Sequence, residues 1–135
     1  MMRQAIWFYS IAFAGLALAG CGTSGPAYGP VSSDVPAVIH MTNGFDFEPR
    51  TIRIKAGETV EWRNTSLIAH TVTDDPRQDP KAMALPSGVE PFDSGDIPAG
   101  QVYRHTFMAP GAYRYQCEPH DYLNMTGTVI VEPSR

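Results

Sequence analysis

The chain has 135 residues, of which 43% are hydrophobic, and its formal charge at pH 7 is −4. This length suffices for one domain with a single hydrophobic core and excludes two domains of ordinary size. With 14 Asp and Glu against 10 Lys and Arg, the sequence has no basic cluster to neutralise phosphates. We therefore expect no nucleic-acid partner, and the negative field favours basic partners instead.

The start of the chain has the pattern of an export signal. Arg3 supplies a positive charge, residues 5–18 are almost entirely apolar, and small residues precede Cys21. The apolar stretch is shorter than the roughly 20 residues that a bilayer-spanning helix needs. We therefore predict a signal peptide over residues 1–20 rather than a permanent transmembrane helix.

The residues Leu18-Ala19-Gly20-Cys21 resemble the lipobox of bacterial lipoproteins, in which the cysteine is lipidated on sulfur and becomes the mature N-terminus. The resemblance implies a lipid on Cys21 that anchors the protein to a membrane. The alternative is a plain secretory signal with an unmodified Cys21. With the lipid, the protein is expected at the cell envelope, anchored to a membrane on the periplasmic or extracellular side.

The residues after Cys21 have the composition of a tether. Eight of the fourteen residues in 22–35 are Gly, Pro or Ser, and such a segment offers few side chains to bury. We therefore divide the chain into a lipoprotein signal peptide (1–20), a lipidated cysteine with a flexible linker (21–35) and one folded domain (36–135).

Within the domain, apolar and polar residues alternate in short runs separated by Gly and Pro, which is typical of β-strands. The predicted strands are 37–41, 51–55, 59–63, 70–73, 102–107, 112–117 and 127–132. Inward-facing positions follow a period of two: Ile52, Ile54, Val60, Trp62, Val129 and Val131. Seven or eight strands in about a hundred residues predict an all-β fold, a two-sheet β-sandwich. Residues 75–89 contain several prolines and are predicted to form a long surface loop.

Three potential metal ligands, Cys117, His120 and Met125, lie within nine residues. Cys117 ends a predicted strand, and the loop after it, stiffened by Pro119, can fold back over it. If Cys21 carries lipid, Cys117 has no disulfide partner, and metal binding is one reason to retain a lone thiol in an oxidising compartment. Thiolate, imidazole and thioether together suit copper far better than calcium or magnesium.

A trigonal copper site needs a second imidazole, and His70 is the best candidate. It follows the turn-like residues 64–66 and opens a predicted strand, so it is expected near a strand end, where ligands from different strands can converge. His40 and His105 lie within predicted strands beside polar neighbours, and we expect both on the surface.

Over residues 36–135 the chain resembles the cupredoxins, the type 1 blue copper family. The motifs are Phe47-x-Pro49, Ile52-x-Ile54, Gly57-x-x-Val60-x-Trp62, His70-Thr71-Val72, Phe92-Asp93-Ser94-Gly95 and Tyr115-x-Cys117-x-Pro119-His120-x-x-x-x-Met125-x-Gly127. The Cys-x-x-His-x-x-x-x-Met spacing is similar to that of plastocyanin and pseudoazurin.

The resemblance implies a Greek-key sandwich holding one copper ion. His70, Cys117 and His120 would be the equatorial ligands and Met125 the long axial one. The chain departs from the family at Thr71, because many members carry Asn directly after the first histidine ligand. This departure leaves the local hydrogen bonding and the reduction potential open.

The resemblance also implies an electron carrier rather than an enzyme. Four protein ligands leave no open position for a small-molecule substrate. In the family, the loop histidine reaches an apolar surface where redox proteins dock. The residues expected to form that surface here are Leu67, Ile68, Pro119, Tyr122 and Leu123. We expect a monomer that cycles between Cu(II) and Cu(I) with redox protein partners, such as a cytochrome or a copper oxidoreductase.

Three alternatives accompany this interpretation. A copper chaperone or buffer could use the same four ligands, although the closed site favours a carrier. A metal-free immunoglobulin-type module would explain Trp62 and Tyr115-x-Cys117, but the domain lacks the partner cysteine and such a module has no use for His120 and Met125. A hydrolase with Cys117 as nucleophile lacks the third, orienting group usual in such sites.

Overall fold

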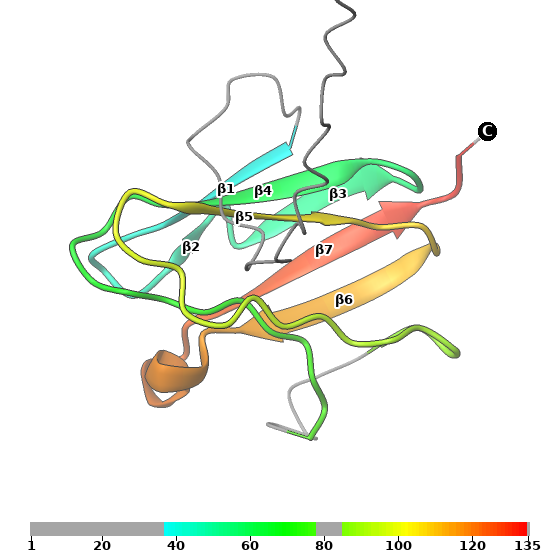
Figure 1. Ribbon diagram of the computed structural model, residues 1–135. Helices are drawn as coiled ribbons and strands as arrows, with labels where there is room; N and C mark the ends of the chain where they lie inside the picture. Colours follow the sequence, from blue (N-terminus) through cyan, green and yellow to red (C-terminus); the bar gives the residue numbers. More distant parts are fainter. Residues whose placement is uncertain (1–36, 78–84, 135) are drawn as a thin grey trace, which may run out of the picture.

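The computed structural model describes residues 37–77 and 85–134, which form two β-sheets of a sandwich (Figure 1). The first sheet has the strand order β2 (Phe47–Glu48), β1 (Ala37–Met41), β4 (Thr59–Asn64), β5 (Val102–Thr106). The second has the order β3 (Thr51–Lys55), β7 (Thr126–Glu132), β6 (Gly111–Gln116). A short 3-10 helix, η1 (Glu118–Leu123), connects β6 to β7. The predicted all-β two-sheet sandwich is confirmed.

Part of the predicted organisation lies outside the described residues. This applies to the signal peptide, the lipidated Cys21, the linker and the middle of the 75–89 loop. In the part of the chain that the structure does describe, no helix is long and apolar enough to cross a membrane.

The strand pairing aligns the inward-facing residues in rows. β1 runs parallel to β4, and β4 runs antiparallel to β5, so that Ile39 pairs with Trp62 and Trp62 pairs with Tyr103. These three side chains are buried, as the period of two along each strand requires. In the second sheet β3 is parallel and β6 antiparallel to β7. The chain moves from the first sheet to the second after β2 and returns after β3.

Aromatic packing joins the two sheets around Trp62. Its ring centroid lies 5.7 Å from that of Tyr103 in its own sheet and 5.4 Å from that of Tyr115 on β6 of the other sheet. Tyr115 also contacts Phe47 at 4.8 Å. Gly127 on β7 makes room for this ring, because a Cβ at that position would lie 2.3 Å from Tyr115. The core therefore fixes the end of β6, directly before Cys117.

One predicted strand was wrong, and one short strand was missed. Residues 70–73 do not form a continuous strand, because they make single bridges, from His70 to Ile97 and from Thr73 to both Asp93 and Gln116. The two-residue strand β2 was not predicted, since it is too short to show a period.

The expectation for His105 also needs correction, because this residue is half-buried and not a fully solvated surface residue. Its ring packs against Phe92 at 4.6 Å and Phe107 at 4.8 Å between ring centroids. This burial lowers the pKa of His105. The polar residues beside it in the sequence gave no sign of Phe92, which comes from a distant loop.

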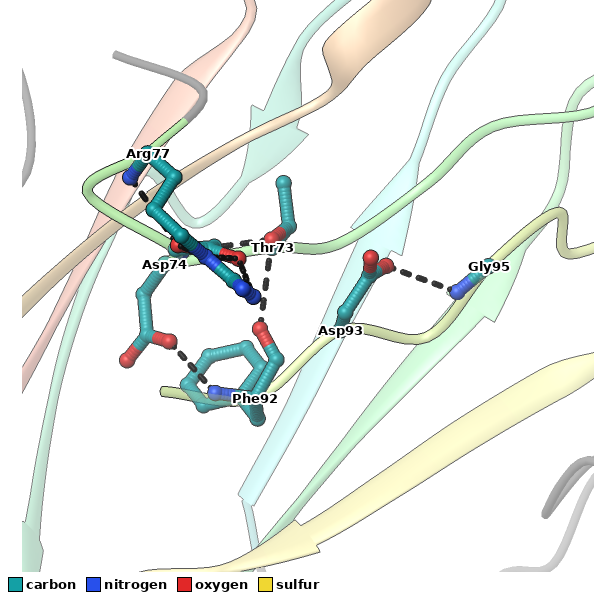
Figure 2. Close-up of polar contacts among 7 residues, drawn as sticks. Thr73, Asp74, Arg77, Phe92, Asp93 and Gly95 are labelled. Carbon is teal, nitrogen blue, oxygen red and sulfur yellow. Dashed lines mark hydrogen bonds and ion pairs between the residues drawn. The ribbon is translucent and has the colours of Figure 1, made fainter. Parts of the chain in front are cut away.

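Hydrogen bonds hold the segment after His70 against the segment around Phe92, as Figure 2 shows. The hydroxyl of Thr73 donates to the carbonyl of Phe92 at 3.2 Å, and the amide of Phe92 donates to Oδ1 of Asp74 at 2.6 Å. One residue on, Asp75 forms an ion pair with Arg77. These contacts anchor the segment that carries His70.

Asp74 is the least satisfied residue of this anchor. Its side chain is completely buried, and Oδ2 has no hydrogen-bond partner among the described residues. Burial raises the pKa of Asp74 from its ordinary value of 3.8 to about 6, although the hydrogen bond from Phe92 opposes the shift. The folded protein therefore retains a proton on Asp74 in a pH range where the unfolded chain has lost it.

We expect Asp74→Asn to change how stability depends on pH. Because the pKa of Asp74 is higher in the folded state, the wild type loses stability as pH rises from about 4 to 6 and stays lower above that range. The Asn side chain keeps an acceptor for Phe92 and carries no charge. As pH rises from 4 to 7, the free energy of unfolding of the variant should increase by about 2 kcal/mol relative to that of wild type. The measurement is urea unfolding of the metal-free proteins. A difference between the two proteins that does not vary with pH would contradict the buried charge.

Candidate metal centre

Three of the predicted ligands converge where the loop after β4 meets the connection between β6 and β7. Cys117 Sγ lies 3.6 Å from Nδ1 of His70 and 3.2 Å from Nδ1 of His120. All three ligand atoms lie within 4.8 Å of one another. Donors that share one ion at roughly 2.0–2.3 Å are separated by about 3–4 Å, so the two Sγ–Nδ1 distances fit a single metal ion.

Met125 ends the loop that folds back over Cys117. The amide of Cys117 donates to the carbonyl of Met125 at 3.0 Å, and the amide of Met125 donates to the carbonyl of His120 at 3.4 Å. The Met125 side chain is completely buried. These two backbone hydrogen bonds place Met125 beside Cys117, as the sequence spacing predicted.

His70 is held by backbone hydrogen bonds to Ile97, and the side chain of Asn64 fixes the loop residues around it. Its amide donates to the carbonyl of Ile97 at 3.2 Å and its carbonyl accepts from the Ile97 amide at 2.7 Å. The buried Asn64 side chain donates to the carbonyls of Ile97 and Ile68 and accepts from the Ser66 amide. Residues 64–66 were recognised as turn-like from the sequence, but these hydrogen bonds of the Asn64 side chain were not predicted.

Burial sets the protonation states of the metal-free site. Desolvation, with a smaller contribution from His120, lowers the pKa of His70 from 6.5 to about 4, so this imidazole is neutral at pH 7. Desolvation also raises the pKa of Cys117, against the effect of hydrogen bonds from Thr71. A neutral imidazole can bind a metal ion at once, whereas the thiol must first release its proton.

Thr71 connects the two ligand-bearing segments. Its amide donates to Cys117 Sγ at 3.3 Å, and its hydroxyl accepts from the amide of Glu118 at 2.8 Å. The residue that departs from the common family pattern thus still ties the first histidine segment to the cysteine loop. Donation to sulfur fixes the ligand and tunes its basicity, as contacts around metal ligands generally do.

The residues predicted to form the docking surface lie on the same two loops as the histidines. They include four of the five exposed large apolar side chains among the described residues, with exposed fractions of 85% for Leu67, 77% for Tyr122 and 43% for both Ile68 and Leu123. Pro119 is exposed as well. His120 is half-buried among them, whereas His70 is fully buried.

We expect Thr71→Val to weaken the tie between the loops, because the amide of Glu118 loses its acceptor and Cys117 Sγ loses the contact from the Thr71 hydroxyl at 3.9 Å, while the Thr71 amide still donates to Cys117. The free energy of unfolding of the metal-free protein should fall by about 1–2 kcal/mol. Thr71→Ser keeps the hydroxyl and is the matched control, expected close to wild type. A valine variant as stable as the serine variant would show that the Thr71 hydroxyl does not tie the two loops together.

Comparisons with known proteins agree with this geometry. Residues 35–132 match the family described as copper binding proteins, plastocyanin/azurin family. Plastocyanin from Scenedesmus fuscus is 37% identical over 86 residues, which are 64% of this chain and 86% of that protein. Amicyanin-alpha from Methylorubrum extorquens is 37% identical over 87 residues, 64% of each chain.

Other matches extend the comparison to structure. Plastocyanin from Nostoc punctiforme is 36% identical over 89 residues, so the match spans slightly less than two thirds of that protein. The crystal structure of amicyanin from Paracoccus versutus has a TM-score of 0.55 and 30% identity, and the match covers 76% of this chain and 85% of that one. The chain belongs to the plastocyanin/azurin family of copper-binding proteins.

Proposed function

We propose that the protein is a blue copper electron carrier that holds one copper ion with His70, Cys117, His120 and Met125. The observation that carries the proposal is the approach of one buried sulfur to the Nδ1 atoms of two imidazoles, at 3.6 and 3.2 Å. A thiolate with two imidazoles and a nearby thioether suits copper. Bound copper supplies one-electron chemistry between Cu(II) and Cu(I).

The task of the protein is to keep the ligands in place during electron transfer. His70 is fixed by Ile97 and Asn64, and Cys117 by Thr71 and by the backbone of Met125. Ligands that do not move between oxidation states leave little rearrangement to slow the transfer. A chaperone or buffer would need ligands that leave easily, and the buried, hydrogen-bonded His70 and Cys117 do not favour that alternative.

The copper-loaded, oxidised protein should be intensely blue because of charge transfer from the Cys117 thiolate to copper. Cys117→Ser should abolish the visible band, and His70→Ala should strongly diminish or shift it. His40→Gln is the control, since His40 lies on β1 outside the ligand cluster, and its spectrum should match wild type. A serine variant that keeps the band, or a wild type that binds zinc but gives no colour with copper, would contradict the proposed site.

We infer that the exposed apolar residues around His120 form the docking surface for a redox protein partner. Leu67 and Tyr122 are largely exposed and lie on the loops that carry the two histidines. Glu118 and Asp121, also exposed, add negative charge to the same helix as His120. This combination fits a partner with an apolar contact area surrounded by basic residues.

Replacing Leu123 by Lys should slow electron exchange with such a partner by roughly tenfold and leave the visible spectrum unchanged. Met108→Lys is a matched control, because Met108 is also an exposed apolar residue but follows β5, at the end of the sandwich away from Cys117. The measurement is the bimolecular rate by stopped flow at several salt concentrations. Equal rates for the two lysine variants would show that the surface around His120 is not the docking surface.

We further propose that the protein is exported and anchored by a lipid on Cys21, which places the domain at the cell envelope. The support is the apolar segment 5–18 and the Leu18-Ala19-Gly20-Cys21 sequence. In cells, Cys21→Ser should move the protein from the membrane fraction to the soluble fraction, whereas Cys117→Ser should not. Equal sedimentation of the Cys21→Ser variant and wild type with membranes would contradict the anchor.

A further inference from the structure

Phe45 has an unfavourable backbone conformation beside the metal centre. It lies in the turn between β1 and β2, with φ at 58°, in the left-handed region that bulky side chains rarely adopt. The turn is closed by a hydrogen bond from the Phe45 amide to the carbonyl of Thr42 at 3.2 Å and another from the Thr42 amide to the carbonyl of Asp46 at 3.0 Å. Asn or Gly would adopt this conformation with less strain, so the phenyl ring itself calls for an explanation.

The ring packs against both histidines of the cluster. Its centroid lies 4.8 Å from that of His120, with the planes tilted by 54°, and 6.3 Å from that of His70 in an edge-on contact. The two imidazoles are 5.0 Å apart. These separations fall in the range of direct aromatic contact. Phe45 comes from a segment that carries none of the four predicted ligands.

His120 depends on such packing more than His70 does. It sits at a kink within η1, with φ −125° and ψ 19°, and is half-buried. Among the described residues, the hydrogen-bonding contact to its ring is Cys117 Sγ at Nδ1. His70, by contrast, is fully buried and bound through its backbone to Ile97. The plane of the His120 ring is therefore fixed by what lies against its face.

We propose that Phe45 is a positioning residue of the metal centre, whose ring holds the His120 imidazole toward Cys117 and keeps water from the site. The inference rests on the proposed copper site. With two neutral imidazoles and one thiolate, the Cu(I) centre has no net charge and the Cu(II) centre has one positive charge. An apolar ring beside the site therefore favours the reduced state.

Phe45→Asn tests the effect of the ring without changing the backbone conformation, because Asn tolerates the left-handed region but has no ring. We expect the equilibrium constant for reduction to fall about threefold and copper loss to a chelator to become about tenfold faster, with a changed visible spectrum. Phe45→Tyr keeps the ring and should restore all three properties. Phe45→Leu, which is apolar but not aromatic, serves as the second test if the Asn variant does not fold.

The control for a general packing defect is Phe107→Leu. Phe107 is buried in the core and contacts Trp62 and Tyr113 rather than either ligand histidine. It should lower the midpoint of denaturant unfolding yet leave the potential and copper release unchanged. If Phe107→Leu alters them as much as Phe45→Asn does, or if Phe45→Asn matches wild type, Phe45 is not a positioning residue.

A readout without metal separates this inference from the proposed function. In the metal-free protein, the ring current of Phe45 should displace the NMR signals of the His120 ring protons, and Phe45→Asn should remove that displacement while Phe45→Tyr keeps it. Unchanged His120 signals in Phe45→Asn would overturn the positioning role. Displaced signals in a wild type that develops no blue colour with copper would instead support the contact and overturn the proposed copper site.

Discussion

The metal centre depends on a pair of backbone hydrogen bonds between Thr73 and Gln116. Each amide donates to the other's carbonyl, at 3.0 and 2.9 Å, and the pair joins the segment after His70 to the end of β6. His70 and Cys117 are separated by 47 residues in the sequence, and this bridge brings their segments together. Because Gln116 precedes Cys117 directly, the same strand that packs Tyr115 into the core delivers the thiol to the site. Packing in the hydrophobic core therefore also fixes the position of Cys117 in the metal centre.

The polar groups beside this bridge hold the segment that carries His70 in place, but one of them lowers the stability of the fold at neutral pH. The amide of Val72 donates to the hydroxyl of Ser94, and the hydroxyl of Thr73 donates to the carbonyl of Phe92. Asp74 is the exception, since one oxygen accepts a hydrogen bond from Phe92 while the other is buried with no partner among the described residues. The segment that carries His70 thus gains rigidity at the expense of some stability at neutral pH. This trade is common where a protein fixes a functional residue.

The sequence predicted the features that repeat locally and missed those that depend on distant contacts. Alternation along β4 and β7 identified their inward faces, and the short Cys117 to Met125 spacing identified most of the ligand cluster. Residues 70–73 also alternate, but their neighbours are single residues far along the chain, so they form bridges and not a strand. Phe45 was not predicted, because neither its conformation nor its contact with His120 follows from a period or a motif.

The electrostatics of the site follow from burial more than from neighbouring charges. His70, with a pKa of about 4, is neutral, and the raised pKa of Cys117 keeps the metal-free thiol protonated. The nearby carboxylates, Glu118 and Asp121, are exposed, so water and salt screen their effect on the metal. Their field acts mainly outward, on an approaching partner. The proposed function therefore separates two tasks: the partly buried Phe45 and the buried Thr71 would set the reduction potential, whereas the exposed acidic and apolar groups would select the partner.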